Sequence, residues 1–370
     1  MNLVTYRSTA ELRTDADRWD DLWLRSDVTA PTMRAALIAD WIDQFAAGDR
    51  LAAVAVEEAG QLVAALPLIA RRTSRFLRLG VLPVDDWNLA NDLLLDATAD
   101  ATAVCRRLVE GMLADSWSLF WFQTVPFETS RWKTLCEAMR QADMPVKVHK
   151  QYQVPVVEVA EDWAAYEASV PGDHRRSRRR YRKMMERDGD VQFEVIRSPP
   201  AEELERLLRE GFEIEDRSWK GEQGTSLLRT PGMFDFYLRQ AQQLAEWNQL
   251  ALVFLKFDGR RIAFSYAWQS KAAHFCVKLG YDDAFRKYGP GQQLTLRLLE
   301  HLHETRICGE LDFWGRLMPW NESWATRTYP LGRIVAAPPR LISRSLMLGY
   351  ESVLPKFRKL NAAWRGTARA

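Results

Sequence analysis

HFCVKLGYDDAFRKYGPGQQLTLRLL, residues 274–299, is the stretch from which the fold can be read. Phe275, Val277 and Leu279 alternate with other residues, which is the period-two pattern of a strand. From Leu294 onward, leucines recur at the spacing of one helical face. The stretch therefore predicts a strand, a glycine-bearing loop and a helix, in that order.

The predicted loop has the features of an anion site. Gly289 and Gly291 remove side chains where backbone amides can converge, and a helix start adds unpaired N–H groups and a partial positive charge. Arg286 adds a full charge three residues before the first glycine. This Arg-x-x-Gly-x-Gly pattern differs from the P-loop and from the GxGxxG of dinucleotide folds. We expect a pyrophosphate here, the alternative being a turn whose glycines serve geometry alone.

The loop and its flanking elements resemble the acyl-CoA site of the GNAT acyltransferases, whose loop reads Gln/Arg-x-x-Gly-x-Gly/Ala between a strand and a helix. An aromatic residue commonly precedes the arginine in that family, as Phe285 does here. The resemblance implies that the strand hydrogen-bonds the pantetheine arm of the donor. The donor-binding residues that it implies are Val277, Leu279, Gly280, Arg286, Lys287, Tyr288, Gly289, Pro290, Gly291 and Gln292.

The chain contains an internal repeat. LAAVAVEEAGQLVAALPL from Leu51 aligns with LALVFLKFDGRRIAFSYAW from Leu250, and Gly60 and Gly259 fall at the same offset. In the first copy the loop reads VLPVDDWNLANDLLL (residues 81–95) and lacks the Arg-x-x-Gly-x-Gly pattern. The repeat predicts an α/β protein with mixed sheets, made of two tandem GNAT-like domains of which the first is degenerate.

This arrangement narrows the resemblance to tandem-GNAT proteins, which include the Fem-type peptidyl transferases and the CelD-like acyltransferases. The likeness extends over about residues 10–335. We expect a degenerate GNAT-like domain over 1–165, a GNAT domain with the donor loop over 166–336, and a basic amphipathic tail over 337–370. Such a tail either lies on a membrane surface, grips an acidic partner or packs back on the body.

Other patterns predict the elements around the loop. We expect helices within 9–48, a β-hairpin over 51–70, a helix near 100–114, an aromatic strand over 118–126 and a helix over 201–220. The last helix ends in an acidic cluster that we expect to pair with the arginine-rich segment described next. Its members are Glu213, Glu215 and Asp216.

Residues 173–187 hold eight Arg or Lys, so a helix there is positive all round. One interpretation is a solvated face. Three functional interpretations compete with it: docking of the CoA 3′-phosphate, holding an acidic acceptor or carrier protein, or gripping tRNA as Fem-type enzymes do. RNA binding favours interleaved aromatic residues for stacking, and Tyr181 alone is present.

Composition bounds the class of protein. A chain of 370 residues exceeds a comfortable single core, which favours two domains, and a formal charge of +2 gives no global polyelectrolyte character. Four cysteines without a CxxC predict neither a zinc site nor a disulfide framework, and His301 and His303 are expected on the exposed side of their helix. No signal peptide or spanning segment is evident, so we expect a cytoplasmic protein with membrane contact confined to the tail.

Acyl transfer from a thioester to an amine needs a neutral nucleophile, donors for the oxyanion and a proton for the departing thiolate, but no metal. The resemblance implies that backbone amides from Val277 to Gly280 serve the oxyanion. Asp282 is the first candidate for acceptor binding or proton removal and Asp283 the alternate, although an aspartate there equally caps the turn. Asp312 is a further candidate, with a buried hydrogen-bonded role as its alternative.

The general acid is less defined. Many relatives place Tyr-Lys after the last strand, where this chain has Trp320-Asn321, so the proton for the thiolate falls to Tyr281, Tyr288, Tyr329 or water. We expect the acceptor to contact tryptophans. The candidates are Trp314, Trp320 and Trp219.

The sequence thus predicts an N-acyltransferase that moves an acyl group from acyl-CoA, or from an acyl carrier protein, to a small-molecule or peptide amine. Two alternatives stay open at this point. One is peptide-bond formation of the Fem type, with aminoacyl-tRNA as donor, which the scarcity of stacking aromatics disfavours. The other is a non-catalytic scaffold in a biosynthetic complex.

Overall fold

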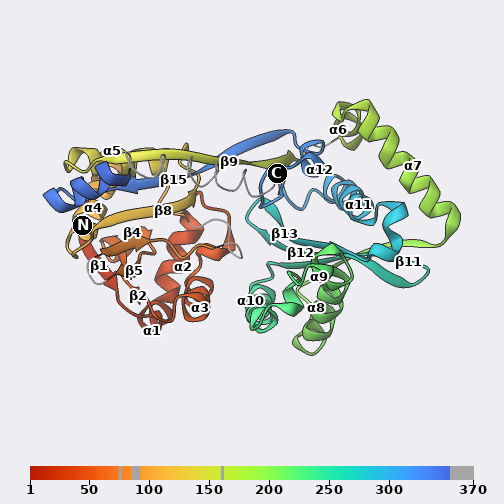
Figure 1. Cartoon of the computed structure of the whole chain (residues 1–370), viewed down its shortest axis with the longest axis horizontal. Helices are drawn as coiled ribbons and strands as arrows, with labels where there is room; N and C mark the ends of the chain where they lie inside the picture. Colours follow the sequence, from red (N-terminus) through yellow and green to blue (C-terminus); the bar gives the residue numbers. More distant parts are fainter. Residues whose placement is uncertain (75–76, 86–91, 160–161, 351–370) are drawn as a thin grey trace, which may run out of the picture. The chain divides into compact units, whose positions relative to one another are not determined.

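The computed structural model describes residues 1–74, 77–85, 92–159 and 162–350 (Figure 1). The chain divides into two compact units: unit 1 comprises 1–28, 32–151 and 330–370, and unit 2 comprises 29–31 and 152–329. The boundary between the units is crossed twice by strands. It falls within β9 (Val146–Glu158) and near the start of β15 (Arg327–Ala336). Each repeat therefore lends a strand to the unit formed mainly by the other. The domain limits at residues 165 and 336 stay predictions.

Unit 2 is built on a mixed sheet. Its strands, in spatial order, are β10 (Val191–Arg197), β11 (Leu250–Phe257), β12 (Arg260–Ser270), β13 (Ala273–Tyr281), β14 (Glu310–Asp312) and the end of β9. Neighbours from β10 to β13 are antiparallel, β14 runs parallel to β13, and β9 runs antiparallel to β14. The predicted strand before the donor loop is β13, and the predicted helix after it is α11 (Pro290–Thr305), so both predictions are confirmed.

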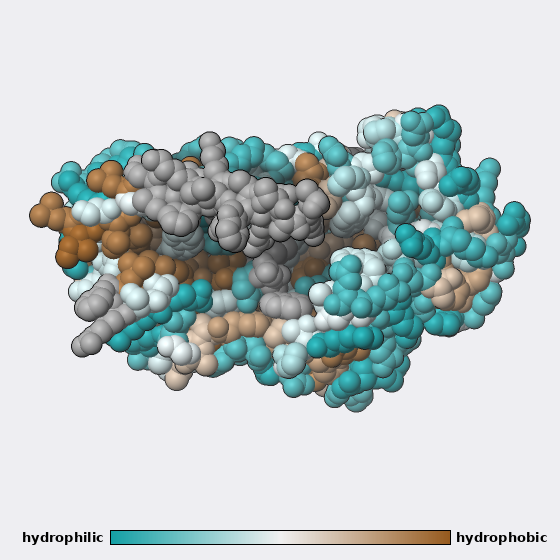
Figure 2. Space-filling view, in the orientation of Figure 1, coloured by the Kyte–Doolittle hydropathy of each residue, from teal (hydrophilic) through white to brown (hydrophobic). Residues whose placement is uncertain are grey.

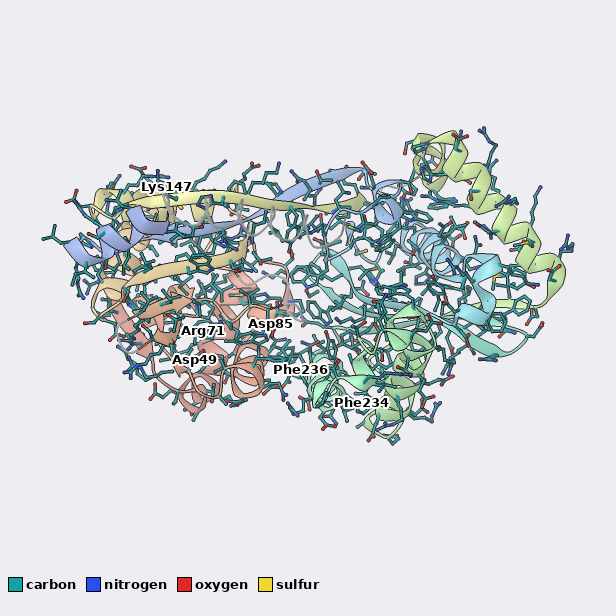
Figure 3. The ribbon with its side chains drawn as sticks, in the orientation of Figure 1. Asp49, Arg71, Asp85, Lys147, Phe234 and Phe236 are labelled. Carbon is teal, nitrogen blue, oxygen red and sulfur yellow. The ribbon has the colours of Figure 1, made fainter. Side chains whose placement is uncertain are left out.

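Helices cover both faces of this sheet. On one face lie α8 (Ala201–Asp216), the short α9 (Trp219–Glu222) and α10 (Met233–Glu246); on the other lie α6 (Trp163–Ser169), α7 (Gly172–Asp188) and α11, with α12 (Pro319–Glu322) after β14 (Figure 1). Phe234 and Phe236 mark α10 in Figure 3, and the ring of Phe234 packs against Phe212 of α8. Gly211 of α8 lies directly on the ring of Phe264 of β12. A Cβ at this position would come within 2.5 Å of the ring, so a larger residue does not fit without a shift.

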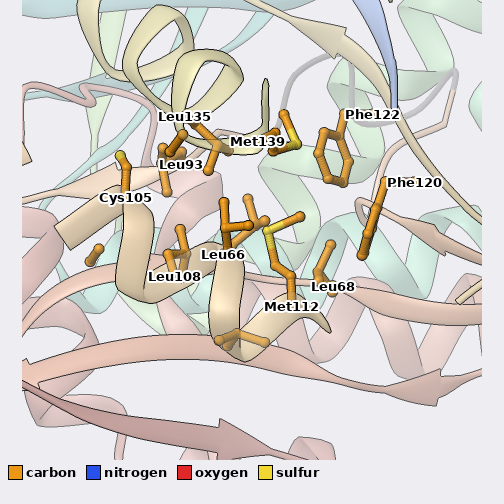
Figure 4. Close-up of a cluster of buried hydrophobic side chains, with 14 of the residues drawn as sticks. Leu66, Leu68, Leu93, Cys105, Leu108, Met112, Phe120, Phe122, Leu135 and Met139 are labelled. Atoms are coloured by element: carbon orange, nitrogen blue, oxygen red, sulfur yellow. The ribbon is translucent and has the colours of Figure 1, made fainter. Parts of the chain in front are cut away.

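Unit 1 repeats the architecture in a shorter form. One sheet contains β1 (Asn2–Tyr6), β3 (Ala53–Glu58), β4 (Gln61–Leu66) and β7 (Leu94–Leu95); further strands are β2 (Arg50–Leu51), β5 (Ile69–Ser74), β6 (Leu77–Val81), β8 (Leu119–Val125) and the end of β15. The helices are α1 (Thr9–Thr14), α2 (Ala16–Arg25), α3 (Ala35–Phe45), α4 (Ala101–Leu113) and α5 (Ser130–Gln141). Aliphatic and aromatic side chains from α4, α5, β4 and β8 form its core (Figure 4). An ion pair of Arg71 with Asp49 ties β5 to the segment before β2 (Figure 3).

The repeat predicted from the sequence is confirmed. Both units carry a tight hairpin whose turn has positive φ at two successive residues, Ala59-Gly60 in unit 1 and Asp258-Gly259 in unit 2. In both units a strand then pairs in parallel with the strand that follows the long helix, β6 with β8 and β13 with β14. Where β12 runs unbroken, its counterpart is interrupted at Pro67 between β4 and β5, because proline has no N–H for the ladder.

The remaining predicted elements are confirmed with one change. Helices α1 to α3, the β3–β4 hairpin, α4 and β8 lie where they were expected. The helix predicted over 201–220 is wrong at its end, since α8 stops at Asp216 and α9 begins anew at Trp219. The break has a local cause: the side chain of Ser218 accepts the amide of Lys220, which is the cap of a new helix start.

The tail can be followed only in part. Residues 341–350 are helical, and the rest of the predicted amphipathic tail, 351–370, lies outside the described residues. Part of the degenerate loop over 81–95, residues 86–91, lies outside them too. Within the described ranges no helix is long and apolar enough to cross a membrane.

Candidate functional site

The strands β13 and β14 separate in the middle of the unit 2 sheet. They pair over Ala273–Phe275 and Glu310–Asp312, and beyond this the amide of Phe313 donates to the carbonyl of Pro155 on β9 instead. β13 continues for six more residues, of which 276–279 are half-buried although they belong to an inner strand. The pairing geometry therefore leaves backbone groups of β13 available to an extended ligand.

A β-bulge marks the point of separation. Lys278 pairs with Tyr266 while Cys276 pairs with Ala267, so Val277 is the extra residue. Bulges interrupt the ladder and redirect side chains and amides, and they are frequent beside active sites. The residues that the resemblance assigned to the donor on this strand thus lie at and after a bulge.

The far end of β13 is packed tightly on α8 and α9. A Cβ on Gly280 would lie 2.7 Å from the Cα of Glu215, so a side chain is excluded there. Lys220 of α9 donates to the carbonyl of Leu279 at 3.2 Å and pairs with Glu215 at 2.6 Å. Close packing on α8 therefore requires a glycine at position 280, in addition to its predicted role in donor binding.

Asp282 joins β13 to the donor loop. One carboxylate oxygen accepts the amide of Ala284 and caps the 3-10 turn Asp283–Tyr288, while the other pairs with Arg217 at 2.9 Å and Arg260 at 2.5 Å. The carboxylate is almost wholly buried. This arrangement favours the capping alternative over proton removal, because the carboxylate caps the turn and is the shared counter-ion of two arginines. Asp283 is half-buried and follows it on the turn.

We expect Asp282→Asn to cost about 1–3 kcal/mol in the free energy of unfolding, because two arginines and an amide lose a charged acceptor. Donor affinity should fall with it, since the capped turn positions the loop. Urea unfolding and donor titration measure the two effects. Asp283→Asn is the matched control and should change neither by more than about 0.5 kcal/mol. Unchanged stability in Asp282→Asn would show that the carboxylate is not structural.

The donor loop ends in an uncapped helix start. Gly289 has φ +61°, in the left-handed region that favours glycine, and no side chain of the described residues caps α11. Pro290 at the first helical position has no N–H, so the first-turn amides belong to Gly291 and Gln292. A Cβ on Gly291 would lie 3.3 Å from the ring of Tyr281.

The corresponding helix of unit 1 begins differently. The carboxylate of Asp100 accepts the amides of Thr102 and Ala103, which satisfies and charge-compensates the start of α4. A bound anion would have to compete with this side chain. The comparison gives a physical reason why the first copy is degenerate: its helix start carries its own anion, whereas that of α11 does not.

The charged residues of the donor loop are exposed, whereas its tyrosine is buried. Arg286 and Lys287 are exposed, as a contact with a phosphate requires. Tyr288 is buried, with its ring on Phe257 and its hydroxyl donating to Asp188 at 3.1 Å. Tyr288 therefore has a core role in the loop.

Asp312 lies where β14 leaves β13. Its side chain is buried; one oxygen accepts the amide of Trp314 at 2.6 Å and the other accepts the hydroxyl of Tyr329 at 2.8 Å. Burial raises the pKa of Asp312 to about 7, against the lowering effect of these two hydrogen bonds. The pKa of Tyr329 is raised well above its ordinary value by burial and by the neighbouring carboxylate. A carboxyl group that changes charge near neutral pH suits general base catalysis.

The backbone after Asp312 is constrained. Trp314 has φ +49°, an uncommon conformation for a bulky residue, and its ring packs edge-on against Trp268 and Phe275. Its amide is the donor that fixes Asp312. A left-handed residue held by its surroundings is typical of functional sites. The sequence identified Asp312 and Tyr329 as separate candidates but gave no signal that they pair.

The arginine-rich helix α7 covers the start of α11. Tyr181 lies against Gly289, and Gln293 of α11 donates its side-chain amide to the carbonyl of Arg178. A cavity of about 60 Å³ opens between these helices and α12. Its lining residues are His174, Ser177, Arg178, Gln292, Pro319, Trp320, Ser323 and Trp324.

Residues 172–322, which contain α7, the bulged strand, the loop and α11, match the family model described as acetyltransferase (GNAT) domain. This segment is similar to the acetyltransferase domains of the GNAT family. No curated protein matches the sequence.

Solved structures share the fold over nearly the whole chain. FemX superposes with a TM-score of 0.60 at 10% identity, over 94% of this chain and 99% of that one. The C-terminal domain of a putative lysylphosphatidylglycerol synthetase from Agrobacterium fabrum gives 0.54 at 17% identity, with coverage of 94% and 97%. L-PGS from Bacillus licheniformis gives 0.54 at 13% identity, with coverage of 90% and 95%. At such identities the likeness establishes the fold alone.

The tryptophans predicted to contact the acceptor occupy three different environments of unit 2. Trp314 is buried beside Asp312. Trp320 is 49% exposed, packs on Phe313 and lines the small cavity. Trp219 is 48% exposed at the start of α9. Their shared role at one acceptor stays a prediction.

Two expectations about this domain are wrong. His303 is not on the exposed side of α11: it is 2% exposed and stacks on Tyr166, because α6 covers that face. The acidic cluster at the end of α8 was expected to form ion pairs with α7, but two of its members pair with residues that follow α8 in the sequence. Glu215 pairs with Lys220, and Asp216 pairs with Arg229.

The cysteines near the site are poor nucleophiles. Burial raises the pKa of Cys276 to about 12 and that of Cys308 to about 11, so both thiols are protonated at neutral pH. A covalent acyl-cysteine step therefore has no support at either position.

Proposed function

We propose that the protein transfers an acyl group from acyl-CoA to an amine, with the donor held along β13 and at the start of α11. The observation that supports this most is the combination of an uncapped helix start after Gly289 with an inner strand whose pairing ends at Phe275. The first offers amides and partial positive charge to a pyrophosphate, and the second offers backbone groups to a pantetheine arm. With such a donor we also propose that the reaction takes place in the cytoplasm.

The proposed reaction is direct attack of the amine on the thioester carbonyl. Asp312, ionised above about pH 7, accepts the proton that the amine loses as the C–N bond forms. Backbone amides at the bulge and beyond, from Val277 to Gly280, stabilise the oxyanion. The C–S bond then breaks, and the thiolate takes a proton from Tyr281 or from water. Tyr281 is preferred over Tyr329, whose hydroxyl donates to Asp312.

The acceptor belongs to the class of small-molecule or peptide amines, and the donor arm is borne by CoA or by an acyl carrier protein. Trp320 and Trp219 are the exposed aromatic side chains through which we expect an acceptor to be contacted. CoA and a carrier protein present the same pantetheine arm, so β13 serves either donor, whereas the pyrophosphate that we assign to the loop is present in CoA alone.

A second candidate function is Fem-type transfer from an aminoacyl-tRNA. A basic stripe on the outer face of α7 favours it: Arg176, Arg180, Lys183 and Arg187 follow one side of the helix, and the surface over α7 is hydrophilic (Figure 2). The fold likeness to FemX and to lysylphosphatidylglycerol synthetase agrees with this alternative without deciding it. Against it, Tyr181 is half-buried with its ring against Gly289, which leaves less of the ring for base stacking.

The experiment that tests the proposed function is a panel of acyl-CoA donors and amines, followed by release of CoA thiol and by the mass of the product. We expect thiol release that depends on the amine, with one acyl chain length preferred. Turnover of charged tRNA instead, with log affinity falling by about 0.7–0.9 per phosphate contact per log unit of salt, would support the Fem-type alternative. Failure with both donors would favour a non-catalytic scaffold.

A further inference from the structure

Arg178 is a buried arginine that forms no ion pair with a residue that the structure describes. Its residue is 6% exposed, on the inner face of α7. One guanidinium nitrogen, Nη2, donates to the carbonyl and the hydroxyl of Ser323 at 3.1 and 2.9 Å, and the group stacks 3.1 Å from the centre of the Trp324 ring. Among the residues that the structure describes, Arg178 forms no ion pair, and its Nε and Nη1 atoms have no hydrogen-bond acceptor.

This arrangement is unusual because buried charges are generally paired. Arginine is rarely this buried without a counter-ion, since desolvation of an isolated cation is costly. Its neighbours on α7 follow the rule: Arg179 pairs with Glu167 and Arg182 with Glu300. Burial lowers the pKa of Arg178 to about 10, so the group is still charged at neutral pH.

The guanidinium lines the small cavity beside the start of α11. Gln292, on the first turn of α11, lines the same space, so the cavity receives positive potential from the helix start as well as from Arg178. His174 and Ser177 contribute further polar groups. No carboxylate of the described residues lines it. Its volume of about 60 Å³ exceeds the roughly 10–15 Å³ that a cavity needs to hold one water, so it has room for a group larger than a single water.

The small cavity borders a larger one of about 620 Å³. The two share His174, Pro319, Ser323 and Trp324. The larger cavity is bordered by α6 and by the segment from α12 to Thr326. A molecule with a phosphate in the small cavity therefore has the larger cavity beside it for the remainder of its structure.

We propose that Arg178 and the first turn of α11 bind the pyrophosphate of the acyl donor between them. This assignment rests on the proposed function and adds a residue that the loop pattern does not contain. Arg286 approaches the donor from the exposed loop, whereas Arg178 provides a buried cation that is already in place before binding. The missing counter-ion is then the ligand itself.

Isothermal titration with CoA, dephospho-CoA and pantetheine tests the assignment. We expect Arg178→Gln to lower the affinity for CoA and dephospho-CoA by about 10- to 100-fold. The affinity for pantetheine, which has no phosphate, should be unchanged. Arg178→Lys should fall between, because lysine keeps the charge but not the planar donor fork. Arg179→Gln, one residue along α7, is the matched control and should leave all three affinities unchanged.

The thermal midpoint separates this role from a structural one. Without ligand, Arg178→Gln should melt within a few degrees of the wild type, because the variant removes an unpaired buried charge; CoA should raise the midpoint of the wild type more than that of the variant. If Arg178→Gln does not fold, Ser177→Asp serves instead, since it places a carboxylate at the same cavity. It should weaken CoA by a similar factor.

The outcomes are distinct. If the wild type binds CoA and both Arg178→Gln and Ser177→Asp bind it equally well, the Arg178 assignment is overturned while the proposed function stands. A loss confined to CoA, with dephospho-CoA unaffected, would move the site to the 3′-phosphate and contradict the pyrophosphate assignment. If the wild type binds no CoA, the proposed function fails. In that case inorganic pyrophosphate is the probe, and its failure to stabilise the wild type more than Arg178→Gln would overturn the cavity as an anion site.

Discussion

Replacing Asp312 with Asn is expected to lower kcat by 10²- to 10⁴-fold while the fold is retained. The magnitude is that of a general base removed from its reaction. The substitution is nearly isosteric: the amide oxygen still accepts the amide of Trp314, and the side-chain NH₂ donates to Tyr329 in place of the present hydrogen bond. Steady-state kinetics with the preferred acyl-CoA and amine provide the measurement.

The pH dependence gives the same prediction a second readout. Because the pKa of Asp312 is raised to about 7, kcat/KM of the wild type should rise about tenfold per pH unit below pH 7 and level off above it. The stability of the fold should change with pH in the direction opposite to kcat/KM. The raised pKa means that the free energy of unfolding falls as pH rises from the unfolded-state pKa of about 3.9 through 7. In Asp312→Asn both dependences should be lost.

Glu310→Gln is the matched control for this prediction. Glu310 lies two residues earlier on β14 and pairs with Arg327 at the surface. We expect its kcat to stay within about twofold of the wild type, since exposed ion pairs contribute little. If Asp312→Asn keeps full turnover and an unchanged pH profile, Asp312 has no part in proton transfer.

Replacing Gly289 with Asp is expected to weaken CoA binding by on the order of 10²- to 10³-fold. The substitution places a carboxylate at the start of α11, as Asp100 does at the start of α4, although Gly289 is left-handed where Asp100 is extended. A carboxylate there competes with the pyrophosphate for the same amides and repels its charge by several kcal/mol at about 4 Å. Asp is among the residues that tolerate the positive φ of this position. Titration calorimetry with CoA measures the loss.

Gly289→Asn separates charge from shape. Asn accepts the left-handed conformation equally well but carries no charge, so its loss should be about tenfold or less. Both variants should unfold within about 1 kcal/mol of the wild type in urea. Equal losses in the two variants would mean that the side chain blocks the loop by size and that electrostatics at the helix start is unimportant.

Local patterns were sufficient for much of the fold. The strand, loop and helix around Gly289 follow from alternation, glycine placement and helical spacing, all of which are properties of contiguous sequence. The tandem repeat was visible because both hairpins keep the same glycine offset. Local capping was harder: the end of α8 was missed because Ser218 starts a new helix where the apolar pattern continues.

Tertiary contacts account for what sequence reasoning missed. For Asp282 the sequence leaves capping and proton removal open, and its partners Arg217 and Arg260, which come from distant elements, favour the first. Asp312 and Tyr329 are separated by a turn and an intervening short helix, so no spacing rule pairs them. Arg178 is one of eight basic residues in a run, and only the packing of α7 on α11 distinguishes it from its exposed neighbours.

Hydrogen exchange in the presence and absence of acetyl-CoA tests the central claim most directly. If the donor lies along β13 and at the start of α11, peptides that contain residues 276–280 and 289–293 should be protected on binding, while the start of α4 in unit 1 should exchange at the same rate in both samples. Protection at α4, or binding without protection of either β13 or the start of α11, would contradict the account.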